Sequence, residues 1–155
     1  MSFIANLGNI LKKLELAALA VFAIGCVLKV LQLPGTNEAL LVGLMSLAMI
    51  YFLSGFVPLK IAQGNQPHGF TTVLVPILIK VLYIGLAVFC VALLFTFLQY
   101  PGANEQMMIG LSSLVVGSAM GMALVLSNRK HMELLKGALI RSIVAILFYL
   151  ILGLL

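Results

Sequence analysis

The sequence predicts an all-α integral membrane protein. We expect a tandem repeat of two helical hairpins, which gives four transmembrane helices, and a fifth helix at the C-terminus. The first observation behind this fold class is composition: 63% of the 155 residues are hydrophobic, only 8% are charged, and the mean hydropathy is +1.24. Soluble domains carry about 25% charged residues. The composition therefore excludes a soluble enzyme and a nucleic-acid-binding domain.

The second observation is an internal repeat. The segment LQLPGTNEALLVGLMS at residues 31–46 recurs as LQYPGANEQMMIGLSS at residues 98–113. With the same offset, residues 13–50 align with residues 80–117 without a gap. Hydrophobic helices share leucines by chance, but chance does not place the same PG-x-NE turn between two pairs of helices. The repeat therefore indicates a duplicated unit.

Each unit is predicted to be a hairpin of two spans. In the first unit, the apolar run over residues 14–33 is interrupted only by Glu15 and Lys29, and Pro34–Gly35 ends it. Asn37 is expected to cap the second helix, which runs from residue 38 to 57. Each run is about 30 Å long, the thickness of the hydrocarbon core. The predicted units are residues 13–58 and, with helices over 80–98 and 106–126, residues 80–126.

Three flanking segments complete the chain. Residues 3–12 have helical amphipathic spacing and predict a short helix on the membrane surface. Residues 70–79 contain Pro76, and the sequence leaves open whether they are interfacial or extend the third helix. Residues 134–155 are long enough to span, with Lys136 and Arg141 reaching the headgroups, so a fifth membrane helix is favoured over a surface helix.

The basic residues predict the topology. Lys12 and Lys13 precede the first span and Lys60 follows the second, whereas both PG-x-NE turns lack Lys and Arg. Under the positive-inside rule, the N-terminus is cytoplasmic and both turns face outward. The remaining basic residues on the predicted inner side are Arg129, Lys130, Lys136 and Arg141.

No residue pattern predicts catalysis. Cys26 and Cys90 lie in apolar runs without CxxC spacing and are interpreted as small buried hydrophobic residues. His68 and His131 have no companions at metal-ligand spacing, and no nucleotide or hydrolase motif is present. We therefore expect no enzyme activity, no cofactor and no metal.

The candidate interaction patch lies at the outward turns. Lys29 is a charge inside a span, which is by default a functional hypothesis, although it could also reach the outer interface or pair with Glu38. The two turns present matching Gln, Asn and Glu side chains, which either satisfy the turns or meet a partner. The patch comprises Lys29, Gln32, Glu38, Gln99 and Glu105.

A second candidate face is built from small residues. Ser113, Gly117 and Gly121 follow one another at four-residue spacing along the fourth predicted helix. Such a face lets helices approach closely. It predicts either packing within the chain or homodimerisation, and the sequence does not separate the two.

Residues 25–58 resemble the membrane hairpin of the GldL family, the inner-membrane motor subunits of Bacteroidetes gliding and type 9 secretion. The resemblance implies an inner-membrane hairpin of Bacteroidetes origin, but the family's intramembrane glutamate falls on Leu47, and on Leu114 in the second unit. The family's histidine falls on Gln32, and its long cytoplasmic domain has no equivalent here, so motor activity is not implied. The residues that carry the resemblance are Gly25, Leu28, Lys29, Pro34–Gly35, Gly43–Leu44 and FLSGFVP at 52–58.

These patterns predict a non-enzymatic inner-membrane protein that acts as a structural or interaction subunit. Its expected surroundings are the lipid bilayer and a protein partner or further copies of itself, not nucleic acid. The alternative is a small transporter or channel built from parallel repeats. That alternative lacks a polar site at the middle of the membrane, since Lys29, Gln32 and Gln99 lie near the outer ends.

Overall fold

The computed structural model describes residues 2–56, 70–127 and 132–154, with side chains except at residues 2–8, 70–72, 132–134 and 153–154. The described residues form helices and no strands, which confirms the all-α fold class. The helices are α1 (Ser2–Val30), α2 (Thr36–Phe56), α3 (Phe70–Leu98), α4 (Ala103–Ser127) and α5 (Met132–Leu154).

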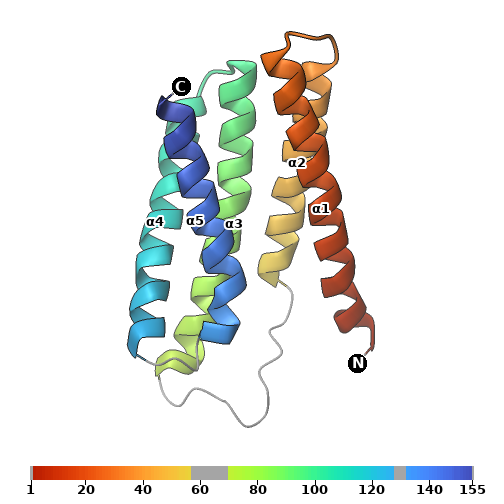
Figure 1. The fold of residues 1–155 in the computed structure, drawn as a ribbon. Helices are drawn as coiled ribbons and strands as arrows, with labels where there is room; N and C mark the ends of the chain where they lie inside the picture. Colours follow the sequence, from red (N-terminus) through yellow and green to blue (C-terminus); the bar gives the residue numbers. More distant parts are fainter. Residues whose placement is uncertain (1, 57–69, 128–131, 155) are drawn as a thin grey trace.

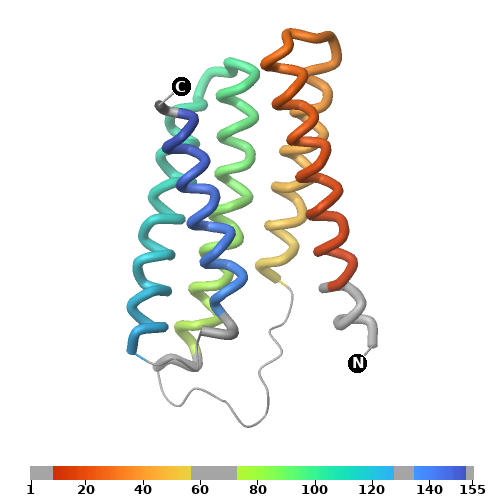
Figure 2. Tube along the Cα trace, in the orientation of Figure 1, coloured from red at the N-terminus to blue at the C-terminus, as the bar shows by residue number. Residues whose placement is uncertain are grey.

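The five helices run side by side in an elongated bundle (Figure 1). Each of the first four packs along the next, and α5 packs against α3 and α4. The α1–α2 and α3–α4 turns lie at the same end of the bundle, together with the C-terminal part of α5, and the N-terminal half of α1 lies toward the opposite end, as the trace in Figure 2 shows.

Within the residues that the structure describes, four helices are long and apolar enough to cross a membrane. They are α2, α3 from Val73, α4, and the part of α5 from Leu135 to Leu152, so the expected fifth helix meets this criterion. The helix α1 is not among them, because it carries Lys12, Lys13, Glu15 and Lys29. The crossing expected over residues 14–33 therefore stays a prediction.

The flanking segments join the neighbouring helices. The separate surface helix expected over residues 3–12 is wrong: α1 is continuous from Ser2 to Val30, and no proline interrupts it. Residues 70–79 extend α3, so the question that the sequence left open is answered, and Pro76 lies inside that helix.

The core is built from leucines and close glycine contacts. Leu40, Leu44, Leu82 and Leu114 are almost fully buried between the helices. A Cβ atom on Gly43 would lie 2.7 Å from the backbone nitrogen of Phe22, and one on Gly110 would lie 3.0 Å from that of Phe89. The two pairs are related by the repeat offset, so the two helices within each hairpin approach each other at equivalent points.

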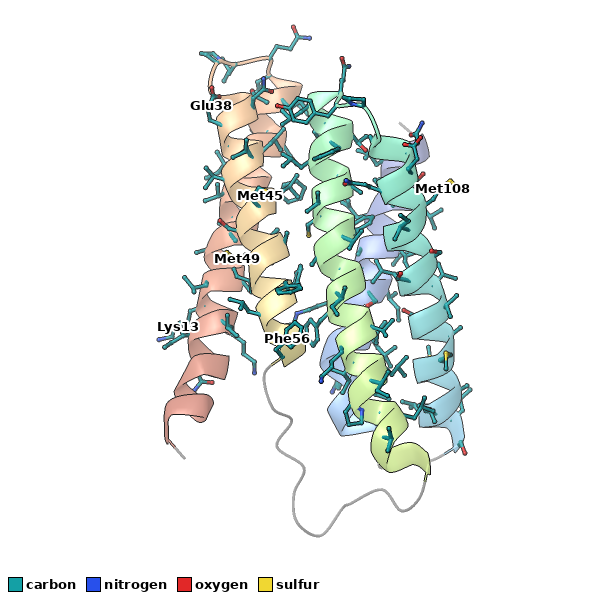
Figure 3. The ribbon with its side chains drawn as sticks, turned by 180° about the vertical axis from the view of Figure 1, so that it is seen from behind. Lys13, Glu38, Met45, Met49, Phe56 and Met108 are labelled. Carbon is teal, nitrogen blue, oxygen red and sulfur yellow. The ribbon has the colours of Figure 1, made fainter. Side chains whose placement is uncertain are left out.

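Large apolar side chains cover the outside. Met45, Met49, Phe56 and Met108 are exposed and project from α2 and α4, as Figure 3 shows from behind. A water-soluble protein rarely exposes so continuous an apolar surface, whereas lipid tails solvate it without cost. The exposed surface therefore supports the bilayer as the surroundings of this bundle.

Candidate functional site

The α1–α2 and α3–α4 turns share one backbone conformation. Gln32 and Gln99 both adopt left-handed φ angles, 53° and 57°. In the first turn, the Leu33 amide donates to the Leu28 carbonyl at 3.0 Å and the Gln32 amide donates to the Lys29 carbonyl at 3.2 Å. This pair of bonds is the Schellman motif, which satisfies carbonyls at a helix C-terminus. The second turn repeats it with Tyr100 N to Phe95 O at 2.9 Å and Gln99 N to Thr96 O at 3.3 Å.

Glycines, and not asparagines, precede the next helices. Gly35 and Gly102 have φ angles of 86° and 85°, and their carbonyls accept the first helical hydrogen bonds from Ala39 and Gln106. The expected cap at Asn37 is therefore wrong, because α2 begins at Thr36, one residue earlier. After a Pro–Gly turn, only the glycine readily takes the positive φ angle that redirects the chain into the helix.

The polar side chains of both turns stay exposed. Gln32, Asn37 and Glu38 are exposed in the first turn, and Gln99, Asn104 and Glu105 are exposed in the second. Within the described part of the chain, these side chains make no hydrogen bond. Backbone hydrogen bonds and glycines with positive φ angles hold both turns. Both turns are therefore closed by backbone groups without hydrogen bonds from these side chains.

Lys29 connects the two hairpins. Its Nζ atom donates to the carbonyl of Phe97 at 2.5 Å and lies 5.2 Å from the centre of the Phe97 ring. The pairing with Glu38, one of the alternatives that the sequence left open, is not formed. Carbonyls in the last turn of a helix lack helical partners and carry the negative end of the dipole, so the ammonium group is stabilised there.

The small-residue face packs within the chain. A Cβ on Gly117 would lie 2.8 Å from Leu82 Cδ2, and one on Gly121 would lie 2.8 Å from Leu139 Cδ2. Ser113 is half-buried and donates its hydroxyl to Ile109 O at 2.9 Å. The helices α3 and α5 therefore already cover Gly117 and Gly121, and of the two alternatives the structure favours internal packing.

An ion pair that the sequence analysis missed links α1 to α5. Arg141 donates from Nε to Glu15 Oε1 at 2.5 Å and from Nη2 to Glu15 Oε2 at 2.7 Å, and Tyr51 donates to Glu15 Oε1 at 3.2 Å. The pair gives Arg141 a partner within the chain, and its expected extension to the headgroups stays a prediction. Charges of opposite sign in two apolar runs could have signalled this pair, since charges at membrane depth need partners.

Leu47 and Leu114, which the sequence resemblance aligned with an intramembrane glutamate, lie in the core. Leu47 is 3% exposed and Leu114 is fully buried. Both contribute to one apolar cluster between the helices. Neither side chain carries an ionisable group.

The fold and the candidate site define a class, a multi-pass helical membrane protein. No known protein family matches the chain, and no match appears among curated proteins or solved structures. Within the described residues, no group of three or more His, Cys, Asp and Glu side chains could hold a metal ion.

Proposed function

We propose that this protein is a non-enzymatic subunit of a complex in a bacterial inner membrane and that it holds a partner through its two outward turns. One observation carries the proposal. Two turns, in two copies of the same unit, expose the same Gln, Asn and Glu side chains on the same backbone, and the turns do not need these side chains.

The glutamines give the strongest support. Gln32 and Gln99 occupy left-handed positions that glycine adopts without strain, while other residues lose about 1 kcal/mol or more there. Both side chains are exposed, so packing does not compensate for this loss. A side chain that is kept at a conformational cost, in both turns, is best explained by contact with a partner.

The candidate interaction patch has a defined set of side chains, and a contact of Lys29 holds its two turns together. Lys29 ties the end of the first hairpin to Phe97 near the second turn, so both turns belong to one surface. Glu38 and Glu105 give this surface two carboxylates beside two amides. A complementary partner presents lysine or arginine side chains and backbone amides outside the membrane.

The location and the lack of motor activity rest on separate support. The resemblance of residues 25–58 to GldL hairpins and the basic residues on one side support an inner membrane with the N-terminus in the cytoplasm. Leucine at positions 47 and 114 supports a scaffold role, because a proton-driven rotor needs an ionisable group at that depth.

The test removes the patch and keeps the turns. In one variant, Gln32 and Gln99 become Gly while Glu38 and Glu105 become Gln. The matched control neutralises two charges at the other end of α1, with Lys12→Gln and Lys13→Gln. We expect the patch variant to lose a protein that co-purifies with both the wild type and the control, while its melting temperature does not fall. Retention of that protein, or a collapse in melting temperature, would contradict the proposal.

A transporter or channel is the second candidate, and the Glu15–Arg141 pair inside the bundle favours it. Paired charges at membrane depth mark many ion pathways. Reconstituted liposomes test this function by ion flux. Saturable flux that disappears when Glu15 and Arg141 are both replaced by Leu would establish transport in place of the scaffold role.

A further inference from the structure

A cavity of about 240 Å³ lies between α1, α2, α3 and α5. The helices α1 and α5 lie on the same side of the α2–α3 pair (Figure 1), and two contacts connect them across the cavity. One is the Glu15–Arg141 pair, and the other is the edge-to-face contact of Phe22 with Phe148, whose ring centres are 5.9 Å apart. The cavity is therefore bounded by a polar contact and by an aromatic contact.

The two ends of the cavity differ in chemistry. Its walls are almost wholly apolar, and the polar side chains in its lining are Glu15, Arg141 and Tyr51, besides the weakly polar thiol of Cys90. Apolar cavities stay free of water and take up apolar molecules of matching size. The walls thus suit a hydrocarbon chain, while the polar end suits a small polar group. The apolar lining includes Leu19, Leu44, Leu86, Phe89, Val144 and Ala145.

The polar end retains hydrogen-bond donors. Each terminal nitrogen of a guanidinium carries two N–H groups. In Arg141, Nη2 uses one on Glu15 and Nη1 uses one on the Gly137 carbonyl at 3.0 Å. One N–H on each nitrogen therefore has no partner within the described residues. Because Glu15 already neutralises Arg141, these donors match an uncharged acceptor better than an anion.

The depth of Arg141 indicates which acceptor is nearby. Arg141 pairs with Glu15, the second residue of the predicted first span over residues 14–33, which Lys12 and Lys13 directly precede. Its side chain extends back by about one turn, as its bond to Gly137 shows. The guanidinium group therefore lies near the boundary of the hydrocarbon core, the region of the ester carbonyls of phospholipids.

From this arrangement we propose that the cavity binds one ester-linked acyl chain of a membrane phospholipid. The ester carbonyl accepts a hydrogen bond from Arg141, and the chain extends along the cavity toward Phe22. The second unit has no such site, because Leu82 takes the place of Glu15 and packs against Gly117. This site is independent of the outward turns and of the proposed partner.

The first experiment compares two lipids that differ only in the carbonyl. Detergent-purified protein is heated with ester-linked phosphatidylcholine or with the ether-linked analogue of the same chain length. A ligand that binds only the folded state raises the melting temperature. We expect the ester-linked lipid to raise it by several degrees more than the ether-linked lipid. Equal shifts would overturn the proposal, because they show lipid contact without recognition of the carbonyl.

The second experiment uses a variant in which a larger side chain fills the cavity. Ala145→Leu adds bulk to a cavity wall and leaves the ion pair in place, and Ala119→Leu makes the same change on the exposed face of α4. We expect Ala145→Leu to abolish the difference between ester and ether lipid, and Ala119→Leu to preserve it. An unchanged difference in Ala145→Leu would place the lipid elsewhere and overturn the site.

A fluorescence measurement keeps the test decisive if Ala145→Leu does not fold. The chain contains no tryptophan, so Leu19→Trp in the cavity wall and Met49→Trp on the outer face of α2 each introduce a single reporter. Brominated lipids quench tryptophan on contact. We expect Trp at position 19 to be quenched more by brominated ester lipid than by brominated ether lipid, and Trp at position 49 to be quenched equally. Equal quenching at both positions would overturn the proposal.

Discussion

The ammonium group of Lys29 donates a hydrogen bond to the main-chain carbonyl of Phe97, 2.5 Å away and 68 residues later in the chain. The contact joins the end of α1 to the end of α3, although the main packing of α1 is against α2. Thr96 occupies the equivalent position in the second unit and donates to Ala92 within its own helix at 2.9 Å. The link between the hairpins is therefore a feature of the first unit.

Replacing Lys29 should loosen this link. Lys29→Met keeps most of the aliphatic stem and removes the donor, so we expect a loss of about 1 kcal/mol in the free energy of unfolding, the usual value for a cation at a helix C-terminus. Thermal unfolding in detergent measures it. Lys80→Met, at an exposed lysine near the other end of α3, serves as the control and should have a smaller effect.

The Glu15–Arg141 pair should show strong coupling between its members. Either Glu15→Leu or Arg141→Leu leaves one charge unpaired in the bundle, at a cost of about 3–5 kcal/mol. The double variant removes both charges and should be close to wild type in stability, since Leu82 occupies the equivalent of position 15 in the second unit. A double-mutant cycle of unfolding free energies measures the coupling. Additive losses would contradict it.

The close glycine contacts should make equivalent Gly→Ala substitutions differ in how much stability they cost. Gly43→Ala places Cβ 2.7 Å from the Phe22 backbone and Gly110→Ala places it 3.0 Å from the Phe89 backbone. Overpacking typically costs about 1–3 kcal/mol, so we expect both to destabilise and Gly43→Ala to do so more. Gly55→Ala, whose nearest contact would be 3.5 Å, should be tolerated. Melting temperatures in the same detergent rank the three.

The left-handed glutamines should limit stability. Gln32→Gly and Gln99→Gly relieve unfavourable φ angles of 53° and 57°. Each should stabilise by about 0.5–1 kcal/mol, because the relieved strain exceeds the extra entropy of glycine in the unfolded chain. Asn37→Gly, within the first turn of α2, should instead destabilise. A fall in stability for the two glutamine variants would show that their side chains support the turns.

The predicted topology can be tested at the same turns. Asn37→Cys and Asn104→Cys place exposed thiols on them, in a background with Cys26→Ala and Cys90→Ala. If both turns face outward, an impermeant maleimide labels both variants in intact spheroplasts. Labelling that requires permeabilised membranes would reverse the orientation.

The sequence by itself determined the helices, their pairing into hairpins and the equivalence of the two turns. Composition and the length of the apolar runs predict the helices because a bilayer permits few backbone structures. The repeated Pro–Gly turn marks where the chain of each hairpin reverses direction. The start of α2 at Thr36 was missed by two residues, since the tolerance of glycine for positive φ angles outweighed the capping preference of Asn37.

Only the tertiary structure decided which side chains meet across the bundle. The pairing of Glu15 with Arg141 depends on the placement of α5 beside α1, which are 126 residues apart at this contact. Likewise, the covering of Gly117 by Leu82 and the reach of Lys29 to Phe97 depend on helix rotation and offset. Hydrophobic periodicity does not encode these quantities for helices that are apolar on every side, because lipid and neighbouring helices solvate such faces equally well.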